Sequence, residues 1–347
     1  MPSLNKAKNE TKTIFKWGGI SLLIIFLFFF GIRFVTLVKN ALAPTPPPQA
    51  SFGKLLAIPF PDQQKENITY SLNTLSGFLP NFGDRVKVYQ LSQPQPTLLA
   101  LENAQKKVSN VNFKNDGIKI SSEEYQWNDL SSPFQRRITM NIFSSDFNLS
   151  SPYLIIPSLQ NFNDSDDEKN RAINLATSFL SDMSLLPIDL DKEKTTTILY
   201  SIDNSTLNTT FRITNAKIIR VNFFQKDLNN LPIYYEKGPI SNINFLIAKE
   251  NNRLKVVEAY YSYKNISDSS STYAIKSASQ TYEELKQGKG YIASKPKDTV
   301  EITINKVSLG YYIGEGYQEY LMPVVIFEGE NNFVAYVSAV RDERINN

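Results

Sequence analysis

The side chains of this 347-residue chain that could do chemistry are carboxylates, lysines, hydroxyls and tyrosines, because it has no Cys and no His. Their absence excludes disulfides, cysteine nucleophiles, Ser-His-Asp triads and every Cys- or His-ligated metal site. Glu123-Glu124 and Glu283-Glu284 resemble the paired carboxylates of glycoside hydrolysis. Adjacent residues diverge on a strand or a helix, whereas two catalytic carboxyls face each other across a substrate. We therefore interpret both pairs as solvated charge.

A denser acidic run, Asp164-Ser165-Asp166-Asp167-Glu168, offers the clustered oxygens that Ca²⁺ prefers. It lacks the Gly and the distant Glu of an EF-hand loop. A Ser or Asp that caps a helix, followed by acids in the first turn, explains the same residues. We expect a helix to begin here, and we predict no metal and no cofactor.

Aromatic residues are the third candidate group, and many of them are tyrosines in the second half of the chain. These are Tyr234-Tyr235, Tyr260-Tyr261, Tyr263, Tyr311-Tyr312, Tyr317 and Tyr320. Rows of aromatic side chains can bind wall sugars or anchor a protein partner. Aromatic residues also favour strands and fill the faces of sheets, and packing is the interpretation that we favour.

Three amphipathic helices are predicted to support these groups. The first begins at Thr97, with an inward face of Leu98, Leu101, Ala104 or Gln105, and Val108. The second follows the acidic run, with an inward face of Ala172, Ile173, Leu175, Ala176, Phe179, Leu180 and Met183. The third begins at Ser277, has Gln280 as its capping-box partner and stops at Gly288.

Between the helices, apolar residues alternate with polar ones, as in strands. The clearest runs are 217–226, 242–249, 253–263 and 299–307. Short turns at 250–252 and 329–332 join successive runs, so these neighbours must be antiparallel. The pattern predicts an α+β fold in which a few amphipathic helices pack on one face of antiparallel sheets. It contains no glycine-rich turn of a dinucleotide fold.

The segment 17–38, WGGISLLIIFLFFFGIRFVTLV, predicts a transmembrane helix. At about 1.5 Å per residue it spans roughly 33 Å, enough to cross a hydrocarbon core of about 30 Å. Arg33 lies near one end, where its side chain can reach the interface, and Trp17 lies at the other. Lipid contacts are assigned to Trp17, Leu23, Phe28, Phe29, Phe30 and Arg33. A buried core helix would need a polar face, which this run lacks.

Basic residues orient this anchor. Lys6, Lys8, Lys12 and Lys16 precede it, opposed only by Glu10. The positive-inside rule predicts a single-pass protein of the cell membrane with a cytoplasmic N-terminus and an extracytoplasmic C-terminal domain. A cleavable signal peptide ending at 41–43 is the alternative, but its apolar core would be unusually long and Pro44 would follow the cleaved bond.

Charge and composition complete the predicted layout. Residues 1–43 carry six basic side chains and one acid, so the rest of the chain has a net charge of −2 and no basic surface for nucleic acid. We predict a cytoplasmic tail at 1–16, the anchor at 17–38 and a Pro-rich linker at 39–60. Two α+β lobes follow at 61–160 and 161–347, divided at the polar run 160–168.

The last third of the chain resembles a known family. The run 273–288, in which a strand leads into a helix that ends in Leu-Lys-Gln-Gly, is similar to extracytoplasmic proteins related to YycH, YycI and PepSY domains. The runs 307–312, 320–327 and 335–340 resemble the closing strands of YycI-type domains. The resemblance, best over 273–340, implies a non-enzymatic membrane-anchored module that restrains a sensor histidine kinase.

The sequence thus predicts a membrane-anchored, extracytoplasmic and non-enzymatic module that binds and modulates another envelope protein. Its partners would be membrane lipid, through 17–38, and an envelope protein such as a sensor kinase. Two alternatives stay open. One is an anchored envelope hydrolase that uses carboxylates, and the other is a glycan-binding module.

Overall fold

The computed structural model describes residues 17–18, 22–23, 26–35, 48–64, 66–130, 134–165, 167–297 and 299–346. The chain forms two compact units, Met1–Pro47 and Pro48–Asn347. In the first unit, the described residues are helical. Across all of these described ranges, no helix combines the length and the apolarity needed to cross a membrane. The predicted cytoplasmic tail and residues 36–47 lie outside the described residues.

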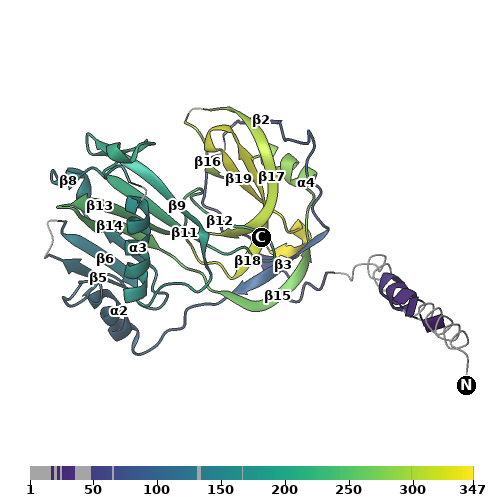
Figure 1. The fold of residues 1–347 in the computed structure, drawn as a ribbon, viewed down its shortest axis with the longest axis horizontal. Coiled ribbons are helices and arrows are strands. Elements are labelled where there is room, and N and C mark those ends of the chain that lie inside the picture. Colours follow the sequence, from purple (N-terminus) through teal and green to yellow (C-terminus); the bar gives the residue numbers. More distant parts are fainter. Residues whose placement is uncertain are drawn as a thin grey trace, which may run out of the picture. The chain divides into compact units, whose positions relative to one another are not determined.

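The second unit is α+β, as predicted, and in its described residues most strands belong to two large sheets (Figure 1). The ten-stranded sheet is antiparallel, in the order β10-β9-β11-β13-β14-β7-β6-β5-β4, with β8 beside β13. Its strands are β4 (Ile118–Lys119), β5 (Glu124–Asp129), β6 (Arg136–Asn141), β7 (Phe147–Ser150), β8 (Leu159–Gln160), β9 (Leu190–Asp203), β10 (Thr206–Thr210), β11 (Ile218–Gln225), β13 (Ile243–Glu250) and β14 (Arg253–Tyr261).

The eight-stranded sheet is built around β17. Its strands are β2 (Thr69–Leu72), β3 (Arg85–Leu91), β12 (Ile233–Tyr235), β15 (Ile266–Ala274), β16 (Tyr291–Ser294), β17 (Glu301–Ile313), β18 (Tyr320–Gly329) and β19 (Val334–Ser338). β17 pairs with β18 in antiparallel fashion and with β2 and β12 in parallel. A separate parallel pair joins β1 (Leu55–Leu56) to β20 (Ile345–Asn346). These parallel pairs were not predicted, because their strands are far apart along the chain and leave no local sequence pattern.

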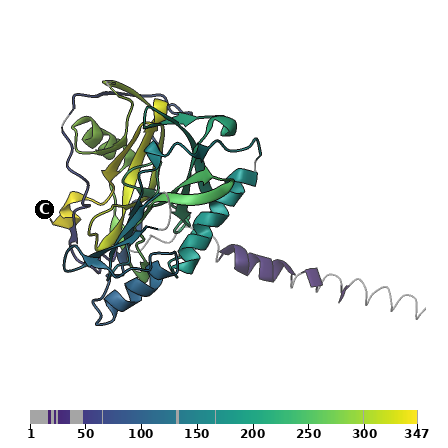
Figure 2. The same cartoon turned by 90° about the vertical axis from the view of Figure 1, so that its left-hand side faces the viewer.

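Helices α2 (Ala100–Ser109) and α3 (Asp167–Asp182) pack on one face of the ten-stranded sheet (Figure 2). The core under α3 contains Ala172, Ala176 and Leu180, as the sequence predicted. The predicted inward face of the first helix needs correction. Leu98 precedes the helix and is fully exposed, and Leu101 is 39% exposed. The helix begins at Ala100, and its buried residues are Ala100 together with Ala104 and Val108, which were predicted.

Helix α4 (Ala278–Lys286) packs on the eight-stranded sheet. Its start has the predicted capping box, in which the Ser277 hydroxyl accepts from the Gln280 N–H and the Gln280 side chain accepts from the Ser277 N–H. Gly288 follows the helix with φ +71°, a left-handed conformation that glycine adopts without steric strain. The predicted boundaries of this helix are therefore confirmed.

Irregular segments join the elements. Four short 3₁₀ helices occur in the described part of the chain, η1 (Tyr153–Ile155), η2 (Ile213–Asn215), η3 (Glu330–Asn332) and η4 (Asp342–Arg344). The β13–β14 hairpin turns at Asn251 and Asn252, whose φ angles are +48° and +59°. Two consecutive left-handed residues match the right-handed twist of the flanking strands, and Asn tolerates this conformation better than most residues.

The predicted division at residue 160 does not separate the sheets. β7 lies before this position and pairs with β14, which lies after it. Likewise, β3 lies before residue 160 and pairs with β15 and β18, which both lie after it. The chain ends build most of the eight-stranded sheet, while the middle of the chain builds the ten-stranded sheet. Because pairing between distant strands leaves no local pattern, the polar run at 160–168 was a poor guide to the boundary.

The predicted linker, 39–60, also needs correction. Its second half belongs to the folded unit. The Ala50 N–H donates to the Thr272 carbonyl on β15 at 3.0 Å, and Leu55 is fully buried in β1. Ile58 is also buried in the same apolar cluster. These apolar residues dock against the eight-stranded sheet, so only 39–47 remains as a candidate tether.

Candidate functional site

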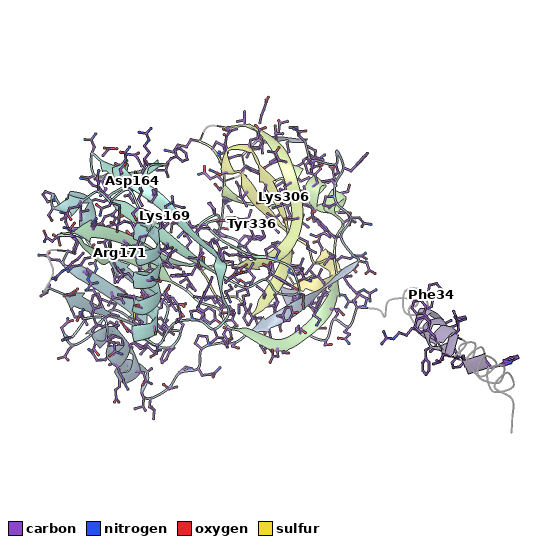
Figure 3. The ribbon with its side chains drawn as sticks, viewed as in Figure 1. Phe34, Asp164, Lys169, Arg171, Lys306 and Tyr336 are labelled. Atoms are coloured by element: carbon purple, nitrogen blue, oxygen red, sulfur yellow. The ribbon has the colours of Figure 1, made fainter. Side chains whose placement is uncertain are left out.

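The residues that the sequence assigned to lipid contact all lie in the described helical part of the first unit. The side chains of Trp17, Leu23, Phe28, Phe29 and Phe30 are between 61% and 66% exposed. Phe34, on the same helix, is 62% exposed (Figure 3). Arg33 is also helical and exposed. This segment therefore presents a large apolar surface.

The two predicted carboxylate pairs do not form paired acids. Glu283 pairs with Lys286 at 2.7 Å, while its neighbour Glu284 pairs with Lys276 at 2.8 Å. Glu123 accepts a hydrogen bond from Asn141 at 3.2 Å. Glu123, Glu283 and Glu284 therefore each have a separate polar or charged partner, as expected for charge at a protein surface.

The acidic run begins helix α3. The Ser165 hydroxyl accepts a hydrogen bond from the Asp167 N–H at 3.1 Å, which confirms Ser165 as a residue that satisfies the helix start. Asp166 lies outside the described residues. Asp164, Lys169 and Arg171 are seen in Figure 3. Among the residues with described positions, no group of three or more acids could hold a metal ion.

Glu168 is the unexpected member of this run, because it is buried with Lys249. Their side chains are both 2% exposed and lie 2.8 Å apart, and Arg171 adds a contact at 3.1 Å. Burial acts to raise the pKa of the Glu168 carboxyl, but the hydrogen bond and charge of Lys249 outweigh it, so the pKa is lowered. This is a structural ion pair under α3.

Most of the tyrosines are packing residues, as predicted. Tyr235, Tyr261, Tyr311 and Tyr312 are at most 4% exposed. Tyr336, seen in Figure 3, packs its ring 5.6 Å from that of Tyr312. Among the predicted tyrosines, Tyr260 stays partly accessible and Tyr317 is 67% exposed.

The face of the ten-stranded sheet opposite α2 and α3 carries a feature that was not predicted from the sequence. A polar row crosses seven strands on the face opposite α2 and α3, each member directly paired with the next. Its members are Thr196, Asn222, Asn244, Tyr260, Asn148, Thr139 and Gln126. Paired residues of an antiparallel sheet point to the same face, so these amides and hydroxyls form one continuous line.

One end of the polar row opens into a cavity of about 480 Å³, which we call the sheet groove. Strands β5, β6, β7 and β14 form its floor. The residues that line it include Gln126, Arg137, Thr139, Asp146, Asn148, Tyr260, Ser262 and Glu315. The groove combines amides, hydroxyls, carboxylates and one aromatic ring on a rigid sheet.

A tight turn between β6 and β7 places Asp146 in the groove. The Asn141 side chain accepts hydrogen bonds from the N–H groups of Phe143 and Ser144 at 2.9 and 3.0 Å, and Ser145 adopts φ +62°. An Asn side chain commonly stabilises such turns. The turn ends where the Asp146 carbonyl accepts from the Asn141 N–H at 2.9 Å, which starts β7.

The Asp146 carboxyl is incompletely satisfied. Burial raises its pKa, and the charge of Lys264, at 3.6 Å, does not cancel this effect. Its Oδ1 atom and the Ser262 Oγ atom are both buried and make no hydrogen bond with described residues. Ser262 itself is 2% exposed. Such groups are uncommon in proteins and mark positions where a ligand can complete the hydrogen bonds.

The other wall of the groove comes from the eight-stranded side of the unit. Glu315, in the β17–β18 turn, pairs with Lys237 at 2.7 Å, and the Lys237 ammonium lies 5.7 Å from the Tyr260 ring centroid. The Glu315 N–H donates to the Glu236 carboxylate at 3.0 Å. Burial, with the charges of Glu315 and Asp146, raises the pKa of Tyr260, so its hydroxyl stays protonated. The groove thus lies where the two sheets meet.

The chemistry of this groove is hydrogen bonding. It provides donors in Arg137 and the amides, acceptors in three carboxylates, and an aromatic ring beside them. No histidine or cysteine is available for nucleophilic or general-base catalysis. The alternation of polar and apolar residues along β5, β6, β7 and β14 was the sequence signal for this face. The register in which these strands pair with one another cannot be predicted from the local sequence.

Comparisons with known proteins leave the family open. No family model matches the chain, and no curated protein matches it. Among solved structures, it is similar to an uncharacterized protein from Eubacterium rectale ATCC 33656, with 16% identity over 80% of this chain and 90% of that chain and a TM-score of 0.39. At that TM-score the likeness carries no argument about fold or function.

Proposed function

We propose that this chain is a membrane-anchored, extracytoplasmic and non-enzymatic module that binds and modulates another envelope protein. The observation that carries the proposal is the segment 17–38, with four lysines before it and large exposed apolar side chains along it. A soluble monomer rarely exposes so much contiguous apolar surface, which is typical of membrane or protein contact. The lysines orient the helix with its N-terminus in the cytoplasm.

The way the chain enters the folded unit supports this role. The first described residues of that unit run along β15, where the Gln49 N–H donates to the Thr272 hydroxyl at 3.0 Å and the Ser51 N–H to the Ser271 hydroxyl at 2.8 Å. Phe52 then packs its ring 5.1 Å from that of Tyr320. A chain that emerges from a bilayer would therefore be held against the eight-stranded sheet from its first residues.

The resemblance of 273–340 to YycH- and YycI-related proteins extends the proposal to its partner. In that family the extracytoplasmic module restrains a sensor histidine kinase through contacts in the membrane and outside it. By this resemblance, the partner that we propose is an envelope protein of the sensor-kinase class. The apolar anchor would supply the contacts within the membrane.

Crosslinking followed by co-purification tests the partner role. We would place a photoreactive amino acid at Phe78, whose side chain is 79% exposed on the β2–β3 connection, and at Asn208 on β10 as a control position. After illumination of intact cells and detergent extraction, we expect one reproducible envelope protein to be captured. A full-length chain that is recovered alone from both positions, in repeated extractions, would contradict the proposal.

A second variant separates the anchor from the folded unit. Replacing Leu23 and Phe29 by Lys makes the segment too polar to insert, but leaves residues 48–347 unchanged. We expect this variant to be released from membranes and to lose the crosslinked partner. If it captured the same partner from the aqueous fraction, membrane anchoring would not be part of the function.

A further inference from the structure

We propose that the sheet groove binds an uncharged oligosaccharide. The inference is independent of the identity of any protein partner, because it rests on the polar row, on the cavity of about 480 Å³ at its end and on two buried oxygen atoms without partners.

The lining of the groove matches the hydrogen-bonding pattern of a sugar. Each hydroxyl of a sugar both donates and accepts, and the amide groups of Gln126 on β5 and Asn148 on β7 do the same. Asn148 is exposed, so its amide is available to a ligand. Thr139 lies between them in the row and adds a hydroxyl. Three neighbouring polar side chains thus face the ligand in register.

Two oxygen atoms without hydrogen bonds favour the binding of a ligand in the groove. Asp146 Oδ1 and Ser262 Oγ line the groove and lack hydrogen bonds with the described residues. A buried oxygen without a partner destabilises a protein, so a ligand hydroxyl that hydrogen-bonds to these atoms recovers that energy on binding. Because an ionised carboxylate only accepts and a hydroxyl accepts or donates, a sugar hydroxyl can satisfy both atoms.

Charge favours an uncharged ligand over an acidic polymer. Glu124, Asp146 and Glu315 line the groove with Arg137, and two of these acids have a lysine partner, Lys264 beside Asp146 and Lys237 beside Glu315. The groove therefore has no excess of positive charge that would attract an acidic polysaccharide. The partly accessible ring of Tyr260 offers an apolar surface beside the amides, which suits the C–H face of a sugar ring.

The same lining argues against a protein segment as the ligand. Protein interfaces depend on a few aromatic or aliphatic anchors that enter apolar pockets, and this floor is built from polar side chains. The four strands of the floor, at about 4.8 Å apart, span roughly 14 Å, about the length of three sugar rings. A trisaccharide should therefore fill the groove, whereas a single sugar should reach only part of it.

Isothermal titration calorimetry on the full-length chain tests the proposal. The chain would be held in a detergent without a sugar headgroup, and the probes would be tri-N-acetylchitotriose, cellotriose, maltotriose and, as an acidic probe, tri-galacturonic acid. We expect saturable binding of at least one uncharged trisaccharide. Its monosaccharide should bind about tenfold more weakly, and the acidic probe should not compete.

Substitutions in the groove connect the binding to this site. Asn148→Ala removes an exposed amide, and Tyr260→Ala removes the ring, so each should weaken binding by about fivefold to tenfold. Asn208→Ala is the matched control, because Asn208 is an exposed Asn on edge strand β10, away from the groove. If Tyr260→Ala proves unstable, Thr139→Val tests the same row with a side chain of similar size.

Two results would overturn the inference. One is the absence of saturable binding by all three uncharged trisaccharides to a chain that is shown to be folded by its thermal transition. The other is binding that Asn148→Ala and Thr139→Val leave unchanged. Binding of a serine-rich hexapeptide in place of the sugars would also overturn it, because the groove would then be a peptide site.

Discussion

At the scale of single residues, buried charge occurs in two different settings. The Glu168 carboxylate has two cationic partners, and its pKa is lowered. The Asp146 carboxyl has one cation, Lys264, at 3.6 Å and one buried oxygen without a hydrogen bond, and burial raises its pKa. Proteins tolerate the second arrangement mainly where function requires it. This contrast leads to opposite predictions for the two acids.

Asp146→Asn should stabilise the folded unit at neutral pH. Because burial raises the folded-state pKa above the unfolded-state value of about 3.9, the unfolded chain loses this proton first as pH rises, and stability falls. We expect the variant to gain on the order of 1 kcal/mol in free energy of unfolding at pH 7. Urea unfolding at pH 7 and at pH 3 measures this, since the gain should disappear at pH 3, where both states are protonated.

Glu168→Gln should have the opposite effect. It leaves Lys249 buried without its counter-charge, so we expect a loss of about 3–5 kcal/mol at pH 7. Because the folded-state pKa is lowered, the stabilisation is present above the unfolded-state value and disappears as pH falls through the folded-state pKa. Urea unfolding at pH 7 and at pH 3 measures this loss of stability. The double variant Glu168→Leu with Lys249→Met should recover most of the lost free energy of unfolding. A double variant that is as unstable as Glu168→Gln would contradict this account.

At the scale of elements, the turns decide how the strands pair. The β13–β14 hairpin requires left-handed conformations at Asn251 and Asn252. Asn252→Gly should be neutral or slightly stabilising, whereas Asn252→Val should reduce stability by about 1–2 kcal/mol, because a branched side chain clashes in this conformation. Thermal unfolding of the two variants compares them directly. Equal melting temperatures for the two variants would show that this turn adopts another conformation.

The sequence predicted local elements well. The capping box at Ser277, the left-handed Gly288 and the presence of strands β11, β13 and β14 are all determined by neighbouring residues. The predicted face of α2 was right at Ala104 and Val108, which are buried, but wrong at Leu98, which precedes the helix, and at Leu101, which is 39% exposed. The spacing of apolar residues identifies a helix more reliably than it locates the first turn of that helix.

At the scale of the whole molecule, the unit is assembled from its two ends. β1 pairs with β20, and β2 pairs with β17, across more than two hundred residues. Such pairs depend on long-range packing, so the sequence could not reveal them or the correct division of the sheets. The sheet groove was missed for the same reason. Its residues come from four strands and a turn, and their register decides that they face one cavity.

The second half of the predicted linker should behave as part of the core. Leu55→Ala removes a fully buried side chain and should lower the free energy of unfolding by about 2–5 kcal/mol. Leu56→Ala, at the next position, removes a side chain that is 51% exposed and should change stability much less. Urea unfolding of both variants measures the difference. A similar small effect for both would mean that residues 48–60 are only a tether.

The most direct test of the whole account is the protease accessibility of the folded unit in intact spheroplasts. A C-terminal epitope on the full-length chain would be followed after protease is added outside, with a cytoplasmic protein as the control for intactness. The proposal of a membrane-anchored, extracytoplasmic module predicts that the epitope is lost while the control survives. An epitope that survives until the membrane is opened, or a full-length chain found in the aqueous fraction, would contradict it.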